Sequence, residues 1–569
     1  MILDMHVDVP EIPGKITRKN VRGHAYVYYE LGRDYDPVRK ITIPRRVAIG
    51  RLEADGRMTP NENFRKHLPH ISLPDAFVRE SISGCLRVGT FFLVRKLIGD
   101  LGLRDSLEGV FNGRGQGLLL DLAAYSIVAE DNSAQYYPDY TYNHPVLTEG
   151  MRRYSDSTVS VFFGEMERDQ VQEFLDNWNG GRSTRKRIYI SYDSTNKNCQ
   201  AGDIEMVEYG HAKENRGTPI FNYSIAYDQN NCEPLFYEEY PGSVVDVSQL
   251  QFMLMKADGF GYRNVGVVLD RGYFSKANIL FMREHGVAFV IMVRGLRKLV
   301  SSIVEQVRDT FENDRDNYVA DYGVYGTTTR SRLYAEDTGE SFVHVYYSAG
   351  RVASDRCAVE QRYSQAERYL QSIENQVAQI PKTISDCFDL HFDGARFLCG
   401  KAKKDVYRRE VSLAGYFAIV TSEKMTAAEA LRIYKGRDSS EKLFRMDKSF
   451  LGNRSARVHS DESLFAKVFV GFIALIIRNR IHFFLKNAKL RDERKKNFMN
   501  VPAAIRELEK IEMIRRADGT YTLDHAVTAT QKTILRAFGL DENFIIENAK
   551  TLGEDIARIE KEVLNEGER

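Results

Sequence analysis

Hydrophobic positions along the chain change their period several times, and these changes divide the chain into segments. Apolar and aromatic residues dominate His24–Leu31 and Ile41–Leu52, which predicts strands in a β-rich segment over residues 1–80. From residue 81 to 186 apolar residues recur every three to four positions, as in GLLLDLAAYSIVAED, so this region is predicted to be helical. Helices that end at Gly180-Gly181 fit the usual stop signal.

A mixed order of strands and helices follows from residue 187. Two of the predicted strands, Ile188–Tyr192 and Val265–Leu269, are each followed by an aspartate, Asp193 and Asp270. Parallel pairing of these strands would place both carboxylates at the same sheet edge. The other predicted elements are a hairpin of Ile220–Tyr227 and Pro234–Glu239 around Asp228, helices Val245–Ala257 and Lys276–Glu284, and strand Val287–Val293.

The segment that follows is too long to be a simple connection. Residues 295–421 contain strand-like pieces (SFVHVYYSAG and GYFAIVTS) and a polar helical stretch, Val359–Gln379, so we expect an inserted, β-rich domain. A helix from about Thr426 to Lys448 and an apolar helix, Leu464–Phe484, are predicted within residues 422–485. Residues 486–569 are predicted to be helical, and dimerisation, DNA contact and capping of the core are all open roles for them.

Composition narrows the protein class only a little. The chain has 569 residues, so two to four domains are expected, and its net charge is only +1. DNA binding would therefore depend on local basic patches. Six cysteines occur without a C-x-x-C pair, which favours neither a zinc site nor a disulfide framework. The N-terminus has no signal peptide pattern, and the apolar run Val468–Ile477 is too short to span a bilayer, so no membrane association is expected.

One stretch has the pattern of a functional site. Tyr434, Arg437, Glu441 and Lys448 are separated by three, four and seven residues, so on one helix they share a face. A carboxylate flanked by two cations and a phenol suits a metal ion and phosphates better than core packing. The alternative is a solvated helix face with ion pairs such as Arg437 with Glu441.

These spacings resemble the YREK signature of bacterial insertion-sequence transposases of the DDE type, over about Arg187–Ile481. Gly272 and Tyr273 after Asp270 match the same group. The resemblance implies an α/β fold with an RNase H-like core, which is a mixed sheet with flanking helices. It divides the chain into a β-rich N-terminal segment (1–80), a helical, candidate DNA-end-binding domain (81–186), the core in two parts (187–294 and 422–485), a β-rich insertion domain (295–421) and a C-terminal helical region (486–569).

The resemblance also implies a function. Asp193, Asp270 and Glu441 would be the catalytic residues and would hold two Mg²⁺ ions per site, with Mn²⁺ as a substitute and Asp193 as the bridging ligand. The protein would cleave DNA at the ends of an insertion sequence and transfer the strands into target DNA by cut-and-paste transposition. Its partners would be double-stranded DNA, namely terminal inverted repeats and target, bound by a homodimer or larger synaptic complex in the bacterial cytoplasm, associated with the nucleoid.

DNA contacts are expected in two places. Tyr434, Arg437 and Lys448 would hold phosphates beside the carboxylates, Arg437 by its bidentate guanidinium and Lys448 as a point charge. The basic linker before the first core strand is a further candidate, although charge runs are usually solvated; its cations are Arg182, Arg185, Lys186 and Arg187. Two alternatives stay open: an RNase H-like nuclease without strand transfer, and a domesticated, inactive DNA-binding derivative.

Overall fold

The computed structural model describes residues 7–21, 24–36, 40–53, 56–68, 71, 83–182, 187–201, 204–210, 217–244, 246–293, 297–337, 339–491, 498–516 and 519–567. The chain divides into two compact units, each built from discontinuous segments. Unit 1 contains residues 1–101, 111–166 and 484–569, and unit 2 contains residues 102–110 and 167–483. The six predicted segments stay a prediction, and these units group them differently.

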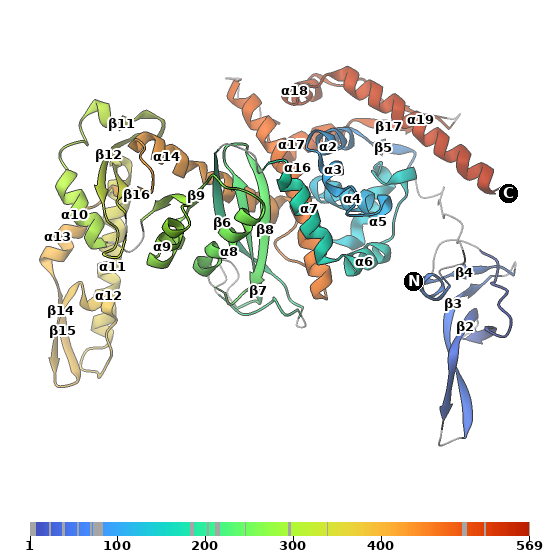
Figure 1. The fold of residues 1–569 in the computed structure, drawn as a ribbon, viewed down its shortest axis with the longest axis horizontal. Coiled ribbons are helices and arrows are strands. Elements are labelled where there is room, and N and C mark those ends of the chain that lie inside the picture. The colour runs from blue at the N-terminus through green and yellow to red at the C-terminus, as the bar shows by residue number, and fades with distance from the viewer. Residues whose placement is uncertain are drawn as a thin grey trace. The chain divides into compact units, whose positions relative to one another are not determined.

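Unit 2 is built on a nine-stranded mixed sheet with the order β11-β12-β13-β16-β10-β9-β6-β7-β8 (Figure 1). In its centre β6 is parallel to β9, and β9 is parallel to β10. On the other side of β6, β7 and β8 form the predicted antiparallel hairpin. The bounds of these five strands are β6 Ile188–Asn198, β7 Ile220–Asp228, β8 Glu233–Pro241, β9 Val265–Leu269 and β10 Ala288–Met292.

The segment predicted as a β-rich insertion adds strands to this same sheet. β16 (Tyr416–Thr421) pairs antiparallel with β10, and β13 (Ser341–Tyr347) pairs with β16. β12 (Val324–Ser331) and the short β11 (Tyr318–Val319) complete this side. Strands of residues 295–421 thus belong to the same sheet as the predicted core strands, and the insertion domain stays a prediction.

Another part of this segment forms a small layer with its own core. Tyr363 and Leu370 of a long helix pack against Phe388 and Phe397 of a two-stranded hairpin. The helix begins ten residues before the predicted Val359, because its first turns are polar and carry no apolar period. The elements here are α10 Arg297–Val307, α11 Ala349–Ser372, α12 Lys382–Ser385, β14 Phe388–Asp393, β15 Arg396–Ala402 and α13 Lys404–Ser412.

Helices flank the sheet of unit 2. α14 lies against β10, β13 and β16, where Leu431 and Tyr434 join Val268, Val290 and Tyr346 in one buried cluster. The helices are α3 Leu103–Leu107, α7 Arg168–Gly180, α8 Asp246–Gly259, α9 Lys276–Glu284, α14 Ala427–Gly436, α15 Asp438–Phe450 and α16 Asp461–Arg491.

The apolar helix α16 is longer than the sequence predicted. Among the described helices it alone is long and apolar enough to cross a membrane by length and composition, and 78% of its apolar stretch is buried inside the protein. That burial fits the expected role of a core helix, since a buried helix needs apolar residues on all sides.

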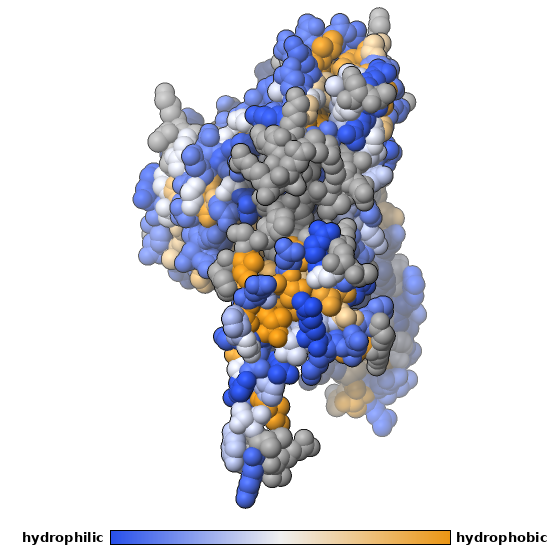
Figure 2. Space-filling view, turned by 90° about the vertical axis from the view of Figure 1, so that its right-hand side faces the viewer, coloured by the Kyte–Doolittle hydropathy of each residue, from blue (hydrophilic) through white to orange (hydrophobic). Residues whose placement is uncertain are grey.

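Unit 1 contains a four-stranded antiparallel sheet near the N-terminus. β1 (Ile16–Val21), β2 (His24–Asp36), β3 (Ile41–Leu52) and β4 (Met58–Pro60) pair in sequence order, and α1 (Glu62–His67) lies against β3. Its core is small, and several apolar side chains are only partly buried; they include Val9, Ile12, Ile16, Val47 and Leu52. Hydrophobic side chains gather at the base of the β2–β3 hairpin in Figure 2.

The rest of unit 1 joins two segments that are far apart in sequence. β5 (Cys85–Arg87) pairs with β17 (Glu512–Arg515), which pairs with β18 (Tyr521–Leu523). His144 Nε2 and Glu509 Oε2 lie 2.6 Å apart in a partly buried hydrogen bond. The helices are α2 Gly89–Asp100, α4 Gly113–Ala129, α5 Tyr137–Asn143, α6 Asp156–Glu165, α17 Val501–Leu508, α18 Ala529–Ala537 and α19 Glu542–Gly567. Of the three roles considered for residues 486–569, namely dimerisation, DNA contact and capping of a core, this structure favours capping.

Candidate active site

Two carboxylates lie at one edge of the parallel part of the sheet. The last parallel pair of β6 and β9 is Tyr192 with Leu269, so Asp193 and Asp270 follow at equivalent positions. This is the arrangement that the sequence predicted. One detail was wrong: β6 does not end at Asp193 but continues to Asn198, because β7 provides an antiparallel partner along that length.

The helix that was predicted over Thr426–Lys448 is two helices. Thr426 caps α14 in a capping box with Glu429, and α14 ends at Gly436. α15 begins at Asp438, with Glu441 in its first turn. The single-helix prediction is therefore wrong at this junction, and the two residues Tyr434 and Glu441 lie on different helices.

Arg437 lies at the junction and points its guanidinium among three carboxylates. Nη1 is 3.6 Å from Asp193 Oδ2, and Nη2 is 3.8 Å from Asp270 Oδ1. The shortest contact is the hydrogen bond from Nη2 to Glu441 Oε1, at 2.7 Å. The Arg437 side chain is 12% exposed and that of Glu441 55%. The three predicted catalytic carboxylates thus converge on one cation, and the alternative Arg437–Glu441 ion pair is also present.

Tyr434 closes the buried side of this group. Its hydroxyl donates to Asp270 Oδ1 over 3.5 Å, and the Arg437 guanidinium lies 5.7 Å from its ring centroid. Burial raises the pKa of Tyr434 to about 12, with Asp270 acting in the same direction and Arg437 against it. The phenol therefore stays a hydrogen-bond donor at neutral pH.

The charge of Arg437 is stabilised by its surroundings. Burial alone lowers the pKa of this guanidinium, but Tyr434, Asp270, Asp193 and Glu441 outweigh burial and raise the pKa above its ordinary value. The site thus contains a permanent cation that balances part of its negative charge.

Lys448 is the fourth residue of the predicted signature. It lies in the last turn of α15, half-buried, about two turns beyond Glu441. Its neighbour Asp447 is fully buried and pairs with Lys197 Nζ at 2.8 Å. That pair joins the end of α15 to β6 and was not predicted, since nothing in the local sequence separates Asp447 from other helix charges.

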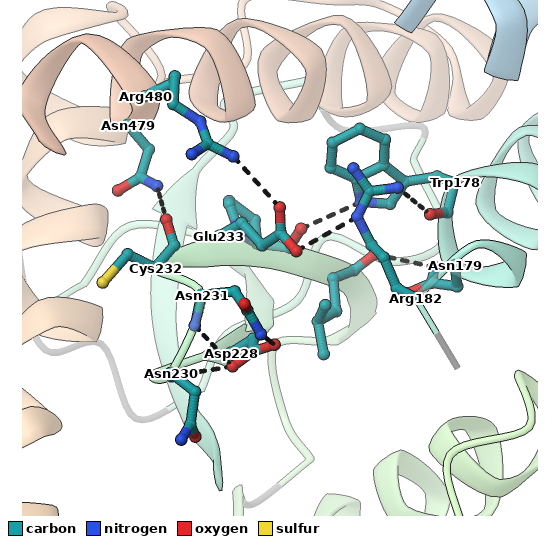
Figure 3. A network of polar contacts seen from close by, with 12 residues as sticks. Trp178, Asn179, Arg182, Asp228, Asn230, Asn231, Cys232, Glu233, Asn479 and Arg480 are labelled. Atoms are coloured by element: carbon teal, nitrogen blue, oxygen red, sulfur yellow. Dashed lines mark hydrogen bonds and ion pairs between the residues drawn. The ribbon is translucent and has the colours of Figure 1, made fainter. Parts of the chain in front are cut away.

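Of the four cations of the basic linker, the structure describes Arg182 and Arg187. Arg182 is engaged inside the protein: Nε donates to Glu233 at 3.3 Å, Nη1 donates to the Trp178 carbonyl, and the guanidinium stacks 3.4 Å from the Trp178 ring centroid (Figure 3). These partners occupy the guanidinium within the protein, and contact of Arg182 with DNA stays a prediction. Arg187 contacts Glu423 and Asn264 and is more open, whereas Arg185 and Lys186 lie outside the described residues.

The ligand chemistry of the three carboxylates suits a hard divalent cation. All three supply oxygen, the ligand that Mg²⁺ prefers. Within the described residues, however, no three His, Cys, Asp or Glu side chains are spaced to close directly on one ion. The guanidinium of Arg437 lies within 4 Å of each of the three carboxylates. The residues therefore fit a divalent ion by the chemistry of their oxygen ligands.

These features define a mixed α/β protein with a carboxylate site at the edge of its central sheet. A family model described as "Transposase DDE domain" matches residues 186–477, just over half of the chain. The chain belongs to this family, and the protein is therefore a DDE transposase. The match covers Asp193, Asp270 and Glu441.

Comparison with solved structures adds little detail. The structure resembles the cryo-EM structure of a piggyBac transposase synaptic complex with hairpin DNA, with 9% sequence identity and a TM-score of 0.34, covering 83% of this chain and 82% of that chain. This similarity is too low to support an argument about the site. No curated protein sequence matches the chain.

Proposed function

We propose that this protein cleaves DNA at the ends of a bacterial insertion sequence and joins the freed 3′ ends to target DNA, as a member of the YREK group. The observation that supports this function most directly is the convergence of Asp193, Asp270 and Glu441 on Arg437, at 2.7–3.8 Å. Two of these carboxylates come from neighbouring parallel strands and the third from a helix more than 160 residues later.

We also propose that the centre of the sheet is an RNase H-like core. The order β10-β9-β6-β7-β8 supports this assignment. In it an antiparallel group of three strands continues into two parallel strands. Asp193 lies within the first strand of the core in chain order, and Asp270 directly follows the fourth.

In this proposal Asp193, Asp270 and Glu441 hold two Mg²⁺ ions, for which Mn²⁺ can substitute. When bound, such ions activate the attacking oxygen and stabilise the leaving oxygen of a phosphodiester. The protein's own residues prepare the site: β6, the end of β9 and α15 hold the three carboxylates, and Arg437 balances part of their negative charge. A DNA phosphate would give Arg437 a new anionic partner and so release the carboxylates.

Other contacts with DNA follow from the position and charge of side chains. Tyr434 can donate to a phosphate because its phenol stays protonated. Lys448 on α15 and the partly open Arg187 beside β6 would contact the backbone further away, with the same role proposed for Arg185 and Lys186. Because strand transfer requires both element ends to be held together, we propose a homodimer or larger synaptic complex in the bacterial cytoplasm.

The test is Mg²⁺-dependent cleavage and strand transfer on a labelled duplex that carries the gene's own flanking ends. Wild type is compared with Glu441→Gln, which keeps the size and removes the charge. We expect wild type to nick the end and join it to target, and the variant to bind DNA but do neither, with a rate at least 100-fold lower, about 3 kcal/mol in barrier.

Two other results would change the assignment. Cleavage without joined products would identify a nuclease that lacks strand transfer. Binding of the end by wild type and variant alike, without cleavage by either, would identify a DNA-binding derivative whose carboxylates are idle.

A further inference from the structure

The helical hydrogen bonds are interrupted at Arg437, between α14 and α15. In a continuous α-helix the Arg437 N–H would donate to the Ile433 carbonyl. Here the Arg437 N–H donates instead to Tyr434, at 3.1 Å, and the Ser440 N–H donates to Arg437, at 2.8 Å, so the chain tightens for one turn. A sharp break of this kind has an identifiable cause.

The side chain of Gln229, from the turn between β7 and β8, lies at this break. Its amide faces both groups of the missing bond: in the orientation that pairs both, its nitrogen donates to Ile433 O at 3.1 Å and its oxygen accepts from Arg437 N at 3.1 Å. The Gln229 side chain, from more than 200 residues earlier, thus bridges the Ile433 carbonyl and the Arg437 N–H in place of their helical hydrogen bond.

Gly436 provides the space for this amide. A Cβ at this position would lie 2.5 Å from the nearest amide atom of Gln229, closer than real Cβ contacts come. Its backbone is not in the left-handed region, so the chain conformation does not call for glycine here, and a Cβ would instead displace the Gln229 amide.

The turn that presents Gln229 is held on several sides. The Gln229 N–H donates to the Tyr189 carbonyl at 2.9 Å, and Asp228 accepts from the N–H groups of Asn230 and Asn231. Figure 3 shows the next residues anchored to α7 and α16, where Glu233 accepts from both Arg182 and Arg480 and the Cys232 carbonyl accepts from Asn479. The amide is therefore presented from a fixed position and not from a free loop.

We propose that Gln229 is a positioning residue for the carboxylate site. The Gln229 amide lies between the Ile433 carbonyl and the Arg437 N–H, and so sets the direction in which α15 starts. That direction in turn places Arg437 and Glu441 beside the two aspartates. One turn further on, Ser440 donates to Ser191 of β6 at 2.6 Å and fixes that start on the sheet. This inference rests on the proposed function, because it assumes that the carboxylates bind divalent ions.

The experiment measures Mn²⁺ binding to the full chain without DNA, by electron paramagnetic resonance, for wild type, Gln229→Ala, Gly436→Ala and the double variant. Either single change removes the amide from between the Ile433 carbonyl and the Arg437 N–H and lets the helix close. We expect the Kd for Mn²⁺ to rise at least fivefold in each, and to rise no further in the double variant, because both changes remove the same contact. The Mg²⁺ concentration needed for half-maximal cleavage should rise in parallel.

Gly259→Ala is the matched control. Gly259 lies at the end of α8 in the same unit, and a Cβ there would meet no atom within 4 Å. Thermal unfolding of each variant shows whether it folds. Because alanine favours helix more than glycine does, a merely local role of Gly436 predicts an equally or more stable protein with unchanged Mn²⁺ binding.

Two outcomes count against the inference, and they differ. If Gln229→Ala and Gly436→Ala fold and bind Mn²⁺ as wild type and Gly259→Ala do, Gln229 does not position the site. If wild type itself binds no Mn²⁺ and cleaves no DNA, the proposed function fails and the inference fails with it.

Discussion

Arg437 contacts carboxylates within the protein, and we propose that it contacts phosphates when DNA binds. In the structure its guanidinium contacts all three carboxylates and is largely buried. An ion that is coordinated by these carboxylates would have to approach the same oxygen atoms, and two cations at such distances repel each other. We therefore expect Arg437 to compete with divalent ions until DNA offers it another anion.

Removal of this guanidinium should strengthen ion binding and weaken DNA binding. For Arg437→Gln we expect the Kd for Mn²⁺ in the absence of DNA to fall about three- to tenfold, the range of one or two partly exposed ion pairs. The affinity for a labelled end duplex should fall at low salt and change less at high salt. Both are measured by titration.

Arg445→Gln is the matched control, because Arg445 is exposed on α15 and carries the same charge. Equal Mn²⁺ affinities of the two variants would show that Arg437 does not compete with the ion and that only net charge matters.

At the scale of elements, a buried histidine joins three strands of the extended sheet. His344 on β13 lies between Thr328 on β12 and Thr421 on β16, at 2.9 and 3.0 Å. The Thr421 hydroxyl donates its hydrogen to the Glu423 carbonyl, so its oxygen accepts from the Nε2–H of His344. In the neutral ring Nδ1 of His344 then accepts from the Thr328 hydroxyl. Burial lowers the pKa of His344 to about 4, so the ring is neutral in the folded protein.

This pKa predicts a loss of stability in acid. The pKa of His344 in the folded protein is below the ordinary value of 6.5. The contribution of the neutral ring to the free energy of unfolding is therefore complete above pH 6.5 and is lost as the pH falls towards 4. The loss amounts to about 3 kcal/mol at about 1.4 kcal/mol per pKa unit. Urea unfolding between pH 7.5 and 4.5 measures it, and His344→Gln should flatten the pH dependence.

The exposed His285 on the C-terminal side of α9 serves as the comparison, since His285→Gln removes an imidazole ring that the fold does not bury. An unchanged pH dependence in His344→Gln would mean that other groups dominate acid unfolding.

Elements with a clear period or a strong end signal were predicted well. β9 and α9 have the predicted bounds, and the β7–β8 hairpin turns at the predicted residues. The length of β6 and the division of the α14–α15 helix were not predicted. Both depend on a partner from elsewhere in the chain, β7 in the first case and Gln229 in the second. Gly436 inside a helical pattern was the one local signal of the break.

At the scale of the whole molecule, the C-terminal segment completes a unit that begins at the N-terminal third. Gly89, the first residue of α2, shows how closely the two segments pack: a Cβ there would lie 2.3 Å from the Leu508 carbonyl and 3.0 Å from the Ile511 side chain. The Val88 N–H also donates to the Ile511 carbonyl at 2.9 Å. The end of α17 is therefore part of the core of unit 1.

A methyl group at Gly89 should separate these segments. We expect Gly89→Ala to destabilise the protein by about 3 kcal/mol, the upper range for overpacking, because the clash is with backbone. Gly99→Ala in the same helix has no atom within 4 Å of its Cβ and should be neutral or stabilising by up to ~1 kcal/mol. Calorimetry of the full chain measures both, and equal effects would contradict the close packing of α2 on α17.

The sequence by itself determined the elements with a regular period, the two aspartates that come directly after the parallel pairing of β6 and β9, and the spacing of Tyr434, Arg437 and Glu441. Each of these depends on residues close along the chain. Only the tertiary structure decided that Arg437 would lie among all three carboxylates, that the Gln229 amide would lie at the break between α14 and α15, and that the C-terminal segment would complete unit 1. Contacts between residues hundreds of positions apart arise when whole elements pack, and they leave no period in the sequence.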